Sequence, residues 1–451
     1  MTKKKSSVAV LGAGISGMSI AYALKKKDIE VTVYEKSGQV GGVIKSKTQN
    51  GWLIEQGPNT LMARSEEVWD LLEELNLVDR IEEAGQLAKK RFIVKESRPQ
   101  PLPMSLTDFI KTDLLTGKAK LRLFKEPFIH AENKPDESIA DFVVRRFGKE
   151  VLDYAVNPFV AGIFAGDPKI LSVKHTFKKL YELERNFGSV SKGMFANKSG
   201  KSGKKALISF SGGLQTLPEA MRDKLGDAIK LDYRINALEY SGDRWSLEFE
   251  NEETANHDII ISCLPAHVLS SIMQEERVEK ITNQLNKITY APMSIIHLGY
   301  KKEQIRHPLD GFGMLVPEVE NFEILGTLFS SSLFPGRAPD DYALLTTFIG
   351  GARNPELAHK SKDILVEKVQ LELDQLLGVA GTPEFVGHTY WEKAIPQYEV
   401  GYDSYLEAMR KAEEELPGFF ISGNIRGGVS VPDCISNGFE TAEKIALLLN
   451  T

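Results

Sequence analysis

The sequence predicts a mixed α/β chain with a dinucleotide-binding unit, a strand-rich unit and a helical unit. Three patterns lead to this prediction: a strand, glycine loop, helix and strand at residues 8–36, a strand, glycine loop and helix after residue 417, and a series of strands over residues 229–350. A chain of 451 residues, 42% hydrophobic and 26% charged, can bury large cores, and we expect two or three domains.

The dinucleotide-binding prediction comes from the N-terminal segment "VAVLGAGISGMSIAYALKKKDIEVTVYEK". Val8–Leu11 is a short apolar strand, a helical pattern runs through Lys27, and "EVTVYE" alternates as a second strand. In this βαβ setting, Gly12 permits a tight turn, Gly14 lets the backbone approach a pyrophosphate, and Gly17 lets the helix pack on the strand. The helix N-terminus then supplies N–H groups and a positive dipole end to the phosphates.

The glycine loop alone does not distinguish an exchanging nicotinamide from a retained flavin. Glu35 follows Gly12 at the spacing of a carboxylate that binds an adenosine ribose, which disfavours the 2′-phosphate of NADP. The C-terminal block "PGFFISGNIRGGVSVPDCISNGFETAEKIALLL" is a second strand, glycine loop and helix, suited to closing over another part of one long ligand. A cofactor held by both ends of the chain exchanges with difficulty, so the two patterns together favour FAD.

Composition excludes several other classes of protein. The two cysteines, Cys263 and Cys434, form no CxxC pair or His/Cys cluster, which argues against a disulfide framework and a zinc site and fits a reducing compartment. We therefore expect no metal, and none of the eight scattered histidines is given a role. The basic start "MTKKKSSVAVLG" leads into a strand rather than a signal segment, and no apolar stretch is long enough to span a membrane.

Charge is distributed unevenly along the chain. The net charge is −6, yet the stretch from Arg91 to Ser209 has 22 Lys and Arg against 13 Asp and Glu. This stretch is either a solvated basic face or a surface attracted to anionic lipid, where each basic group contributes about 1 kcal/mol. Aromatic and basic residues do not interleave there, so we expect no nucleic acid partner. "KSGKSGKK", Lys198–Lys205, is the expected boundary at its end.

The motifs resemble a known family. "GAGISG", "VYEK" and "GNIRGGVSVPDCISNG" resemble the flavin amine oxidase-like FAD proteins, and the middle of the chain resembles the protoporphyrinogen oxidases within that superfamily. The stretches that carry the second resemblance include "KKRF", "NPFVAGIFAGDPKILS", "SFSGGLQTL", "GFGMLVP", "LGTLFSSSLFPGRAPDD", "TTFIGGARN" and "PQYEVGY". The resemblance runs essentially from end to end.

The resemblance implies three domains. The first is an FAD-binding Rossmann-like domain of the glutathione reductase/p-hydroxybenzoate hydroxylase type, from residues 1–90, 206–270 and 385–451. The second is a helical membrane-binding domain at residues 91–205, which is the basic stretch found above. The third is a β-sheet substrate domain at residues 271–384.

The activity that the resemblance implies is the oxidation of protoporphyrinogen IX to protoporphyrin IX by successive hydride transfers to FAD, with O2 as acceptor giving H2O2, in haem biosynthesis. The flavin does the redox work, so no side chain is assigned as catalytic acid or base. The expected partners are a membrane surface on the cytoplasmic side, a second copy in a homodimer, and ferrochelatase.

Other activities remain open at this point. Some family members oxidise coproporphyrinogen III to coproporphyrin III, and this substrate carries four propionates instead of two. Carotenoid desaturases and amine oxidases share the superfamily, although the middle motifs match neither as well. A non-catalytic FAD-binding membrane-associated protein and an NAD-linked dehydrogenase are alternatives of different classes.

The resemblance also implies the residues of the two binding sites. For the substrate, Arg91 in "KKRF" would pair with a propionate, Leu315 and Leu328 would press on one pyrrole ring, Phe348 would stack on another, and the backbone at Gly162 would approach the macrocycle. The implied FAD-binding residues are Gly12, Ala13, Gly14, Ile15, Ser16, Gly17, Glu35, Lys36, Gly41, Gly42, Val43, Gly57, Pro58, Asn59, Thr60, Ile235, Asn424, Val429, Ser430 and Val431.

Overall fold

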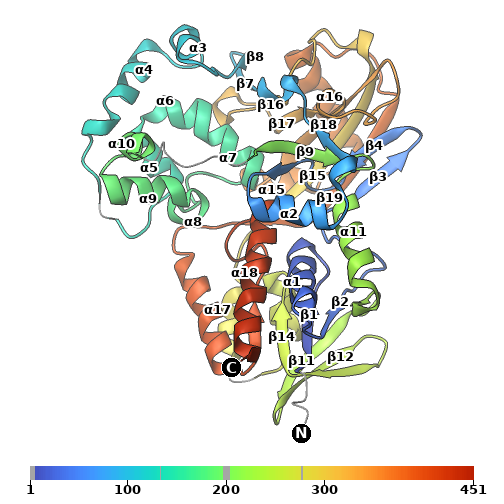
Figure 1. Cartoon of the computed structure of the whole chain (residues 1–451). Coiled ribbons are helices and arrows are strands. Elements are labelled where there is room, and N and C mark those ends of the chain that lie inside the picture. The colour runs from blue at the N-terminus through green and yellow to red at the C-terminus, as the bar shows by residue number, and fades with distance from the viewer. Residues whose placement is uncertain (1–5, 133, 197–203, 276–277, 451) are drawn as a thin grey trace.

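The computed structural model describes residues 6–132, 134–196, 204–275 and 278–450. Figure 1 shows three regions: a region at the bottom that holds both chain ends and a parallel sheet, a helical region at the upper left, and a large sheet at the upper right. The expected boundary loop, Lys198–Lys205, lies mostly outside the described residues.

A five-stranded parallel sheet forms the centre of the lower region. The strand order is β10-β2-β1-β14-β20, and every neighbouring pair is parallel. β1 and β14 are buried along their whole length, which explains why their sequences are continuous apolar runs rather than alternating ones. The strands are β1 (Val8–Leu11), β2 (Val31–Tyr34), β10 (Ile229–Lys230), β14 (Ile259–Ser262) and β20 (Phe419–Ile421).

The two ends of the chain meet in this region. Helix α1 (Ile15–Lys26) follows β1, and helix α18 (Val431–Asn450) follows β20. The two helices pack closely at Gly438, where an added Cβ would lie 2.7 Å from the Cβ of Ser19. The two ends of the chain therefore build one structural unit, because β1 and β20 share one sheet and their helices touch.

The upper sheet has seven strands in the order β19-β15-β18-β17-β16-β7-β8. Its pairs are antiparallel except β16 with β7. Helix α16 (Lys362–Leu377) covers one face, where Leu365, Val369 and Leu373 are fully buried. The strands are β7 (Phe92–Lys95), β8 (Arg98–Pro101), β15 (Tyr290–Lys301), β16 (Gly313–Leu315), β17 (Ile324–Phe329), β18 (Tyr342–Gly350) and β19 (Phe385–Pro396).

The other face of this sheet receives helix α7 (Asn157–Phe164) and strand β4 (Trp52–Glu55), which pairs with β3 (Ser46–Gln49). Gly299 on β15 makes room for β4, because an added Cβ there would lie 2.2 Å from the Trp52 ring. The segment of β3 and β4, which follows the second glycine cluster at Gly41 and Gly42, therefore crosses from the lower region onto the upper sheet.

Two small sheets complete the strands. β11 (Ile235–Ser241), β12 (Arg244–Phe249) and β13 (Thr254–His257) form an antiparallel meander beside the parallel sheet. β9 (Ala206–Phe210) lies between β5 (Leu61–Ala63) and β6 (Ile81–Glu83). Helix α2 (Glu66–Glu74) connects β5 with the following turn, and helix α11 (Thr216–Leu225) follows β9.

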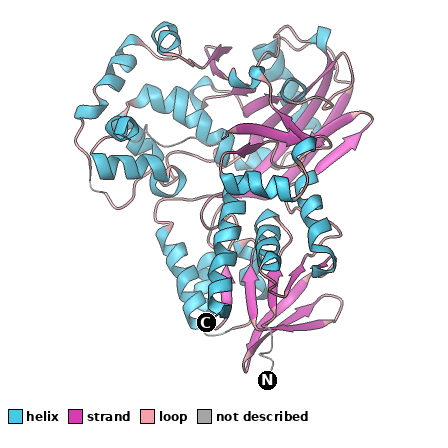
Figure 2. Ribbon diagram, in the orientation of Figure 1, coloured by secondary structure: helices cyan, strands magenta, loops and turns pink. Residues whose placement is uncertain are grey.

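The upper-left region is helical between residues 106 and 196 (Figure 2). It has its own core, which includes Phe142, Val160 and Leu183. Its helices are α3 (Leu106–Lys111), α4 (Gly117–Phe124), α5 (Ile139–Arg146), α6 (Lys149–Val151), a π-helical turn (Leu152–Val156), α7, α8 (Val173–Thr176), α9 (Lys178–Phe187) and α10 (Val190–Ala196). Among the described helices of the whole chain, none is both long and apolar enough to cross a bilayer.

The sheets assign three stretches differently from the domain limits expected above. Residues 92–101 form two strands at one edge of the seven-stranded sheet, not part of the helical region, and residues 385–396 form β19 at its other edge. β19 belongs there because it pairs with β15 over most of its length. Residues 271–275 and 278–288 pack against the core of the parallel sheet through helices α12 (Ala266–Ile272) and α13 (Glu279–Leu285).

Candidate active site

The glycine loop between β1 and α1 has the geometry that its spacing predicts. Gly12 has a φ of +99°, which favours glycine, and its N–H donates to the carbonyl of Tyr34 at 2.8 Å. Gly17 lies against this turn, since a Cβ added there would be 2.0 Å from the Gly12 carbonyl oxygen. At Gly14, by contrast, an added Cβ would meet nothing within 4 Å, and no side chain caps the helix that begins beside it. Open space at an uncapped helix N-terminus fits a pyrophosphate.

Glu35 connects the end of β2 to the glycine loop. Its side chain is 8% exposed, and its carboxylate accepts hydrogen bonds from the Ala13 N–H at 2.9 Å and from the N–H and hydroxyl of Ser37 at 3.0 and 2.8 Å. Lys36, the next residue, is exposed. Ile235 is half-buried near the same end of the loop, because the N–H of Tyr233 donates to the Glu35 carbonyl at 2.8 Å. The structure thus brings the three implied adenosine-end residues into one neighbourhood.

The second glycine cluster docks directly on the first. The Gly41 N–H donates to the Ala13 carbonyl at 2.8 Å, and an added Cβ at Gly42 would lie 3.2 Å from the Gly14 Cα. Gly57 continues the chain of contacts, because its Cβ would lie 2.0 Å from the Val43 carbonyl oxygen. Residues 12–17, 41–43 and 57–60 therefore form one continuous path of contacting backbone. Pro58, Asn59 and Thr60 are half-buried along it.

The C-terminal glycine loop, residues 423–430, lies beside the N-terminal one. Cβ atoms added at Gly12 and at Gly423 would each lie 3.6 Å from the same atom, the Cys263 carbonyl oxygen. The Cys434 thiol donates to the Gly428 carbonyl at 3.8 Å and also hydrogen-bonds with Ser16 of the fingerprint.

Three implied flavin contacts lie at the end of this loop. Val429 and Ser430 are half-buried, and the Ser430 hydroxyl accepts a bond from the Asp433 N–H at 3.3 Å, which caps the start of α18. Val431 is the first residue of α18 and is 8% exposed. The half-buried Asn424 side chain makes no hydrogen bond to any of the described residues, and its amide is therefore available to a ligand.

These residues fit FAD. The open space at Gly14 suits the pyrophosphate, the Glu35 carboxylate lies where an adenosine ribose is gripped, and the path through Val43 and Asn59 leads onto the upper sheet. A ligand that occupies this path must extend from the parallel sheet to the seven-stranded one, which is the requirement for a long dinucleotide.

The implied substrate residues lie on the seven-stranded sheet, on the face that α7 covers. Leu315 pairs across strands with Gly326, and Gly326 pairs with Phe348. Two residues along β17, Leu328 pairs with Thr346. Because cross-strand partners point to the same face, Leu315, Leu328 and Phe348 form one apolar surface. All three are half-buried.

Gly162 joins this surface from α7. An added Cβ at this exposed glycine would lie 2.7 Å from the Leu315 side chain, so the helix backbone rests directly on that leucine. The π-helical turn immediately before α7 is a local irregularity of a kind that often occurs at functional sites.

Arg91 lies at the edge of the same surface. It precedes β7, whose Phe92 pairs with Met314, so strand alternation places Arg91 level with Gly313 and on the face of Leu315. Its guanidinium is 5.0 Å from the centroid of the Phe312 ring and makes no ion pair with the described residues. Burial lowers its pKa, because a desolvated cation loses hydration without gaining a counter-charge here. An anionic group of a ligand would supply that counter-charge.

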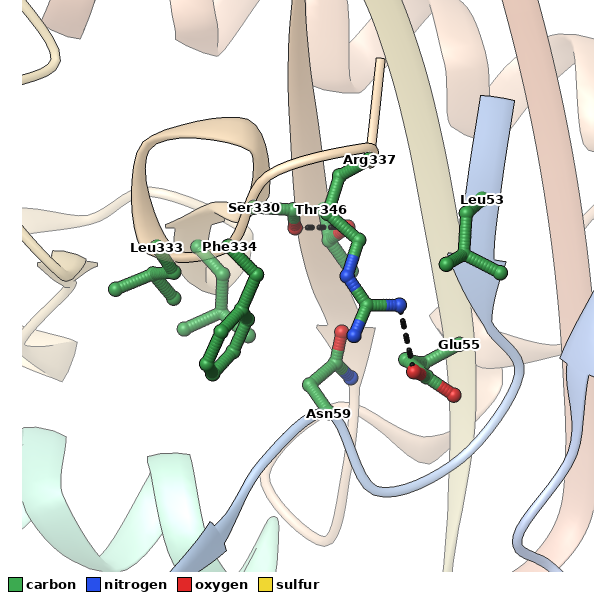
Figure 3. A pocket seen from close by; sticks show the side chains of 9 residues that line it. Leu53, Glu55, Asn59, Ser330, Leu333, Phe334, Arg337 and Thr346 are labelled. Atoms are coloured by element: carbon green, nitrogen blue, oxygen red, sulfur yellow. Dashed lines mark hydrogen bonds and ion pairs between the residues drawn. The ribbon is translucent and has the colours of Figure 1, made fainter. Parts of the chain in front are cut away.

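A pocket lies where this backbone path meets the apolar surface of Leu315, Leu328 and Phe348 (Figure 3). Asn59, implied to contact the flavin, and Leu328, implied to contact the substrate, both line it. The fold therefore brings to one place residues that the resemblance implies for the two sites. The lining residues are Leu53, Glu55, Asn59, Leu328, Ser330, Leu333, Phe334, Arg337 and Thr346.

The pocket also contains a buried ion pair that the sequence did not predict. Arg337 donates to the Glu55 carboxylate at 2.7 Å and to the Ser209 hydroxyl, and both charged side chains are almost fully buried. The Ser46 hydroxyl and the Leu214 N–H also donate to Glu55, at 2.6 and 3.0 Å. Arg337 belongs to the motif "LFSSSLFPGRAP", so its position in a distinctive stretch was the available signal.

Comparisons with known proteins agree with this geometry. Residues 15–446 match the family model described as flavin containing amine oxidoreductase. The chain is 40% identical to protoporphyrinogen oxidase 2, chloroplastic/mitochondrial, of Arabidopsis thaliana, over 98% of this chain and 94% of that protein. It is 37% identical to the mitochondrial protoporphyrinogen oxidase of Nicotiana tabacum, over 98% and 95%, and 26% identical to coproporphyrinogen III oxidase of Bacillus subtilis, over 97% of each.

Solved structures show the same fold. A crystal structure of an Exiguobacterium sp. 255-15 protein matches with a TM-score of 0.84 at 22% identity, over 98% of this chain and 99% of that one. Reduced UDP-galactopyranose mutase matches with a TM-score of 0.77 at 15% identity, over 98% and 96%.

The nicotinamide alternative is therefore set aside, because the family is defined by a flavin, and the dinucleotide that the loop binds is FAD. The protein is an FAD-dependent oxidase. The glycine loops, the two-ended construction and the end-to-end similarity together show that the chain belongs to the flavin-containing amine oxidoreductase family and, within it, to the protoporphyrinogen oxidases.

Proposed function

We propose that the protein oxidises protoporphyrinogen IX to protoporphyrin IX in haem biosynthesis. The names of its plant relatives support this substrate, and the similarity extends over nearly the whole of each chain. The observation that carries the proposal is Arg91, a half-buried guanidinium with no ion-pair partner among the described residues, at the edge of an apolar surface. A reduced tetrapyrrole has both complementary features, an apolar macrocycle and propionate groups.

The chain's own residues bind and orient the substrate. Arg91 would hold a propionate by a charge-assisted hydrogen bond, which fixes the in-plane orientation of the macrocycle. Leu315, Leu328 and Phe348 would press on its rings and exclude water, and the bare backbone of Gly162 would allow close approach. The bound flavin supplies the redox chemistry, accepting a hydride from the macrocycle in each successive oxidation.

The substrate surface favours protoporphyrinogen over coproporphyrinogen. Coproporphyrinogen carries four propionates, two of which replace the vinyl groups of protoporphyrinogen. The leucines and the phenylalanine of this surface offer these additional carboxylates no charge, and burying an unpaired carboxylate costs several kcal/mol. The lower identity to the Bacillus subtilis coproporphyrinogen III oxidase agrees with this preference.

We also propose that the helical region is a membrane-binding domain. Its outer helices carry large apolar side chains that are mostly in solvent, among them Leu106 at 78%, Ile110 at 70% and Phe128 at 83% exposure. Lysines alternate with them, as in "TGKAKLRLFKEPF". Apolar groups flanked by lysines suit a helix that lies in the interface of an anionic bilayer.

The proposal also includes the type of FAD-binding domain, the electron acceptor, the location and the partners. The FAD-binding unit is a Rossmann-like domain of the glutathione reductase/p-hydroxybenzoate hydroxylase type, and dioxygen would serve as the final electron acceptor, giving H2O2. The protein lies on the cytoplasmic side of a membrane as a homodimer and passes its readily oxidised product to ferrochelatase. Failure of the two enzymes to co-purify or to channel protoporphyrin would contradict this last element.

Porphyrin fluorescence in air provides the test of function. Wild-type holoprotein mixed with protoporphyrinogen IX should give a fluorescence rise faster than autoxidation. Arg91→Ala should raise KM about 10- to 100-fold, because a hydrogen bond to a charged group contributes about 1.5–3 kcal/mol. Arg98→Ala is the matched control, since Arg98 is an exposed arginine on the neighbouring strand β8, and its KM should not change.

Three outcomes would contradict the proposal in different ways. Turnover of coproporphyrinogen III alone would support the oxidation chemistry but contradict protoporphyrinogen IX as the substrate. Equal effects of Arg91→Ala and Arg98→Ala would remove the propionate role of Arg91. A flavin-loaded protein that turns over neither porphyrinogen would favour the non-catalytic alternative.

A further inference from the structure

Two buried tyrosines hold the backbone of the C-terminal glycine loop. The Tyr398 hydroxyl donates to the Asn424 carbonyl at 2.7 Å and accepts from the Gly428 N–H at 3.0 Å. The Tyr402 hydroxyl donates to the Ile425 carbonyl at 2.9 Å. The tyrosines are 3% and 1% exposed, and their rings lie 4.5 Å apart between centroids. One hydroxyl thus connects the beginning of the loop with its end.

The loop requires such anchoring because it is rich in glycine. Gly423, Gly427 and Gly428 have φ values of +104°, +89° and +134°, which other residues rarely adopt. Glycine gains more conformational freedom than any other residue when it is released. The bonds from Tyr398 to the Asn424 carbonyl and from Tyr402 to the Ile425 carbonyl fix two consecutive peptide planes. The bond from the Gly428 N–H to Tyr398 fixes a third.

The anchor is itself held from the opposite side. The Tyr398 carbonyl accepts a hydrogen bond from the Ser172 N–H at 2.8 Å, and the Val400 N–H donates to the Ile170 carbonyl at 2.9 Å. The helical region therefore supports the segment that carries Tyr398. Tyr398 is held at its backbone by the helical region and bonds to the loop through its hydroxyl, so it fixes the position of the loop relative to that region.

We propose that Tyr398 is a positioning residue for FAD, which holds the loop from Asn424 to Gly428 closed against the N-terminal fingerprint. Two residues lie between the loop and that fingerprint: Cys263, whose carbonyl is beside both Gly12 and Gly423, and Cys434, whose thiol donates to the Gly428 carbonyl and bonds with Ser16. Tyr402 supports the same loop at one peptide. The proposal rests on the flavin chemistry of the proposed function but not on the identity of the substrate.

The test is FAD binding to deflavinated protein, measured by flavin fluorescence without any porphyrinogen. Tyr398→Phe keeps the ring and removes two hydrogen bonds, so FAD affinity should fall at least tenfold, whereas Tyr402→Phe removes one bond and should cause a smaller loss. Tyr405→Phe is the matched control and should bind FAD like the wild type. Tyr405 packs on Tyr402, but its hydroxyl donates to the Lys287 carbonyl, away from the loop.

Thermal unfolding of the deflavinated variants separates positioning from loss of fold. A positioning role predicts that Tyr398→Phe changes FAD affinity and the visible flavin spectrum while the apoprotein Tm stays within a few degrees of that of Tyr402→Phe. Unchanged FAD affinity in Tyr398→Phe would overturn the proposal, as would an equal loss in Tyr405→Phe. If Tyr398→Phe does not fold, wild-type affinity in Tyr402→Phe would overturn it.

Discussion

Gly14 and Gly17 lie three residues apart, the first at the N-cap of α1 and the second in its first turn, yet they are constrained in opposite ways. Gly17 is fixed by the protein itself, because an added Cβ would overlap the Gly12 carbonyl oxygen. Gly14 has a φ of −70° and a ψ of 171°, which any residue adopts, and an added Cβ there meets only open space. The protein alone therefore gives no reason for a glycine at position 14, whereas the close approach of a pyrophosphate would give one.

This difference predicts opposite outcomes for two alanine variants. Gly14→Ala should leave the unfolding free energy of the apoprotein within about 1 kcal/mol of wild type, since its backbone suits alanine, but should weaken FAD binding at least tenfold. Gly17→Ala should destabilise the apoprotein by about 1–3 kcal/mol through overpacking. Denaturant unfolding and FAD titration of both variants measure this contrast. Wild-type FAD affinity in Gly14→Ala would contradict the pyrophosphate assignment.

At the scale of elements, the Glu55–Arg337 ion pair connects three segments that are distant in the sequence. Glu55 ends β4, Arg337 follows helix α14 (Ser330–Leu333), and the Ser209 hydroxyl on β9 accepts from the same guanidinium. The pair closes the pocket that Asn59 lines. These elements must come together before either charge can lose its hydration without penalty.

Breaking this ion pair should therefore be costly. Arg337→Met leaves the Glu55 carboxylate buried without its cation and should lower the unfolding free energy by about 3–5 kcal/mol. The double variant Glu55→Gln/Arg337→Met removes the unpaired charge and should recover part of that loss. Chemical denaturation of the two variants and wild type gives the comparison. A double variant no more stable than Arg337→Met would show that the charge is not the cause.

At the scale of the whole molecule, the exposed apolar side chains of the described residues include two groups that lie far apart (Figure 1). Leu106, Phe124 and Phe128 lie on the helical region, and Leu447 lies near the end of α18, where the chain terminus is found in Figure 1. The two surfaces differ in charge, because lysines surround the first, whereas Glu440 and Glu443 accompany Lys444 on the second. An anionic bilayer would select the first surface.

Vesicle binding distinguishes these two surfaces. The double variant Phe124→Ser/Phe128→Ser should bind vesicles of anionic phospholipid at least 30-fold more weakly than wild type, because burial of each phenylalanine contributes about 1.5–3 kcal/mol. Leu447→Ser is the matched control and should bind like wild type. Sedimentation with the vesicles measures the affinity, and the comparison of low with high salt separates the apolar contribution from the electrostatic one. Equal loss in the control, or no vesicle binding by wild type, would contradict the membrane-binding domain.

The sequence by itself determined the parts of the molecule whose signals are local. The strand, turn and helix at residues 8–26 follow from an apolar run and the spacing of three glycines, all within one structural unit. The same holds for the helix at residues 362–377 and for the C-terminal strand, loop and helix. The resemblance of the motifs then implied the residues of the two sites. The fold places the implied FAD-binding residues along one backbone path and the implied substrate-binding residues around one face of the seven-stranded sheet.

Only the tertiary structure decided what depends on partners far away in the chain. It placed β7, β8 and β19 at the edges of the seven-stranded sheet, because strand pairing is set by hydrogen bonds between distant segments rather than by local periodicity. It also placed Glu55 beside Arg337, and the loop at Asn424 beside the Tyr398 hydroxyl. In the sequence these residues are ordinary members of distinctive motifs. Their roles arise when burial removes water and leaves each polar group dependent on the partner that the fold supplies.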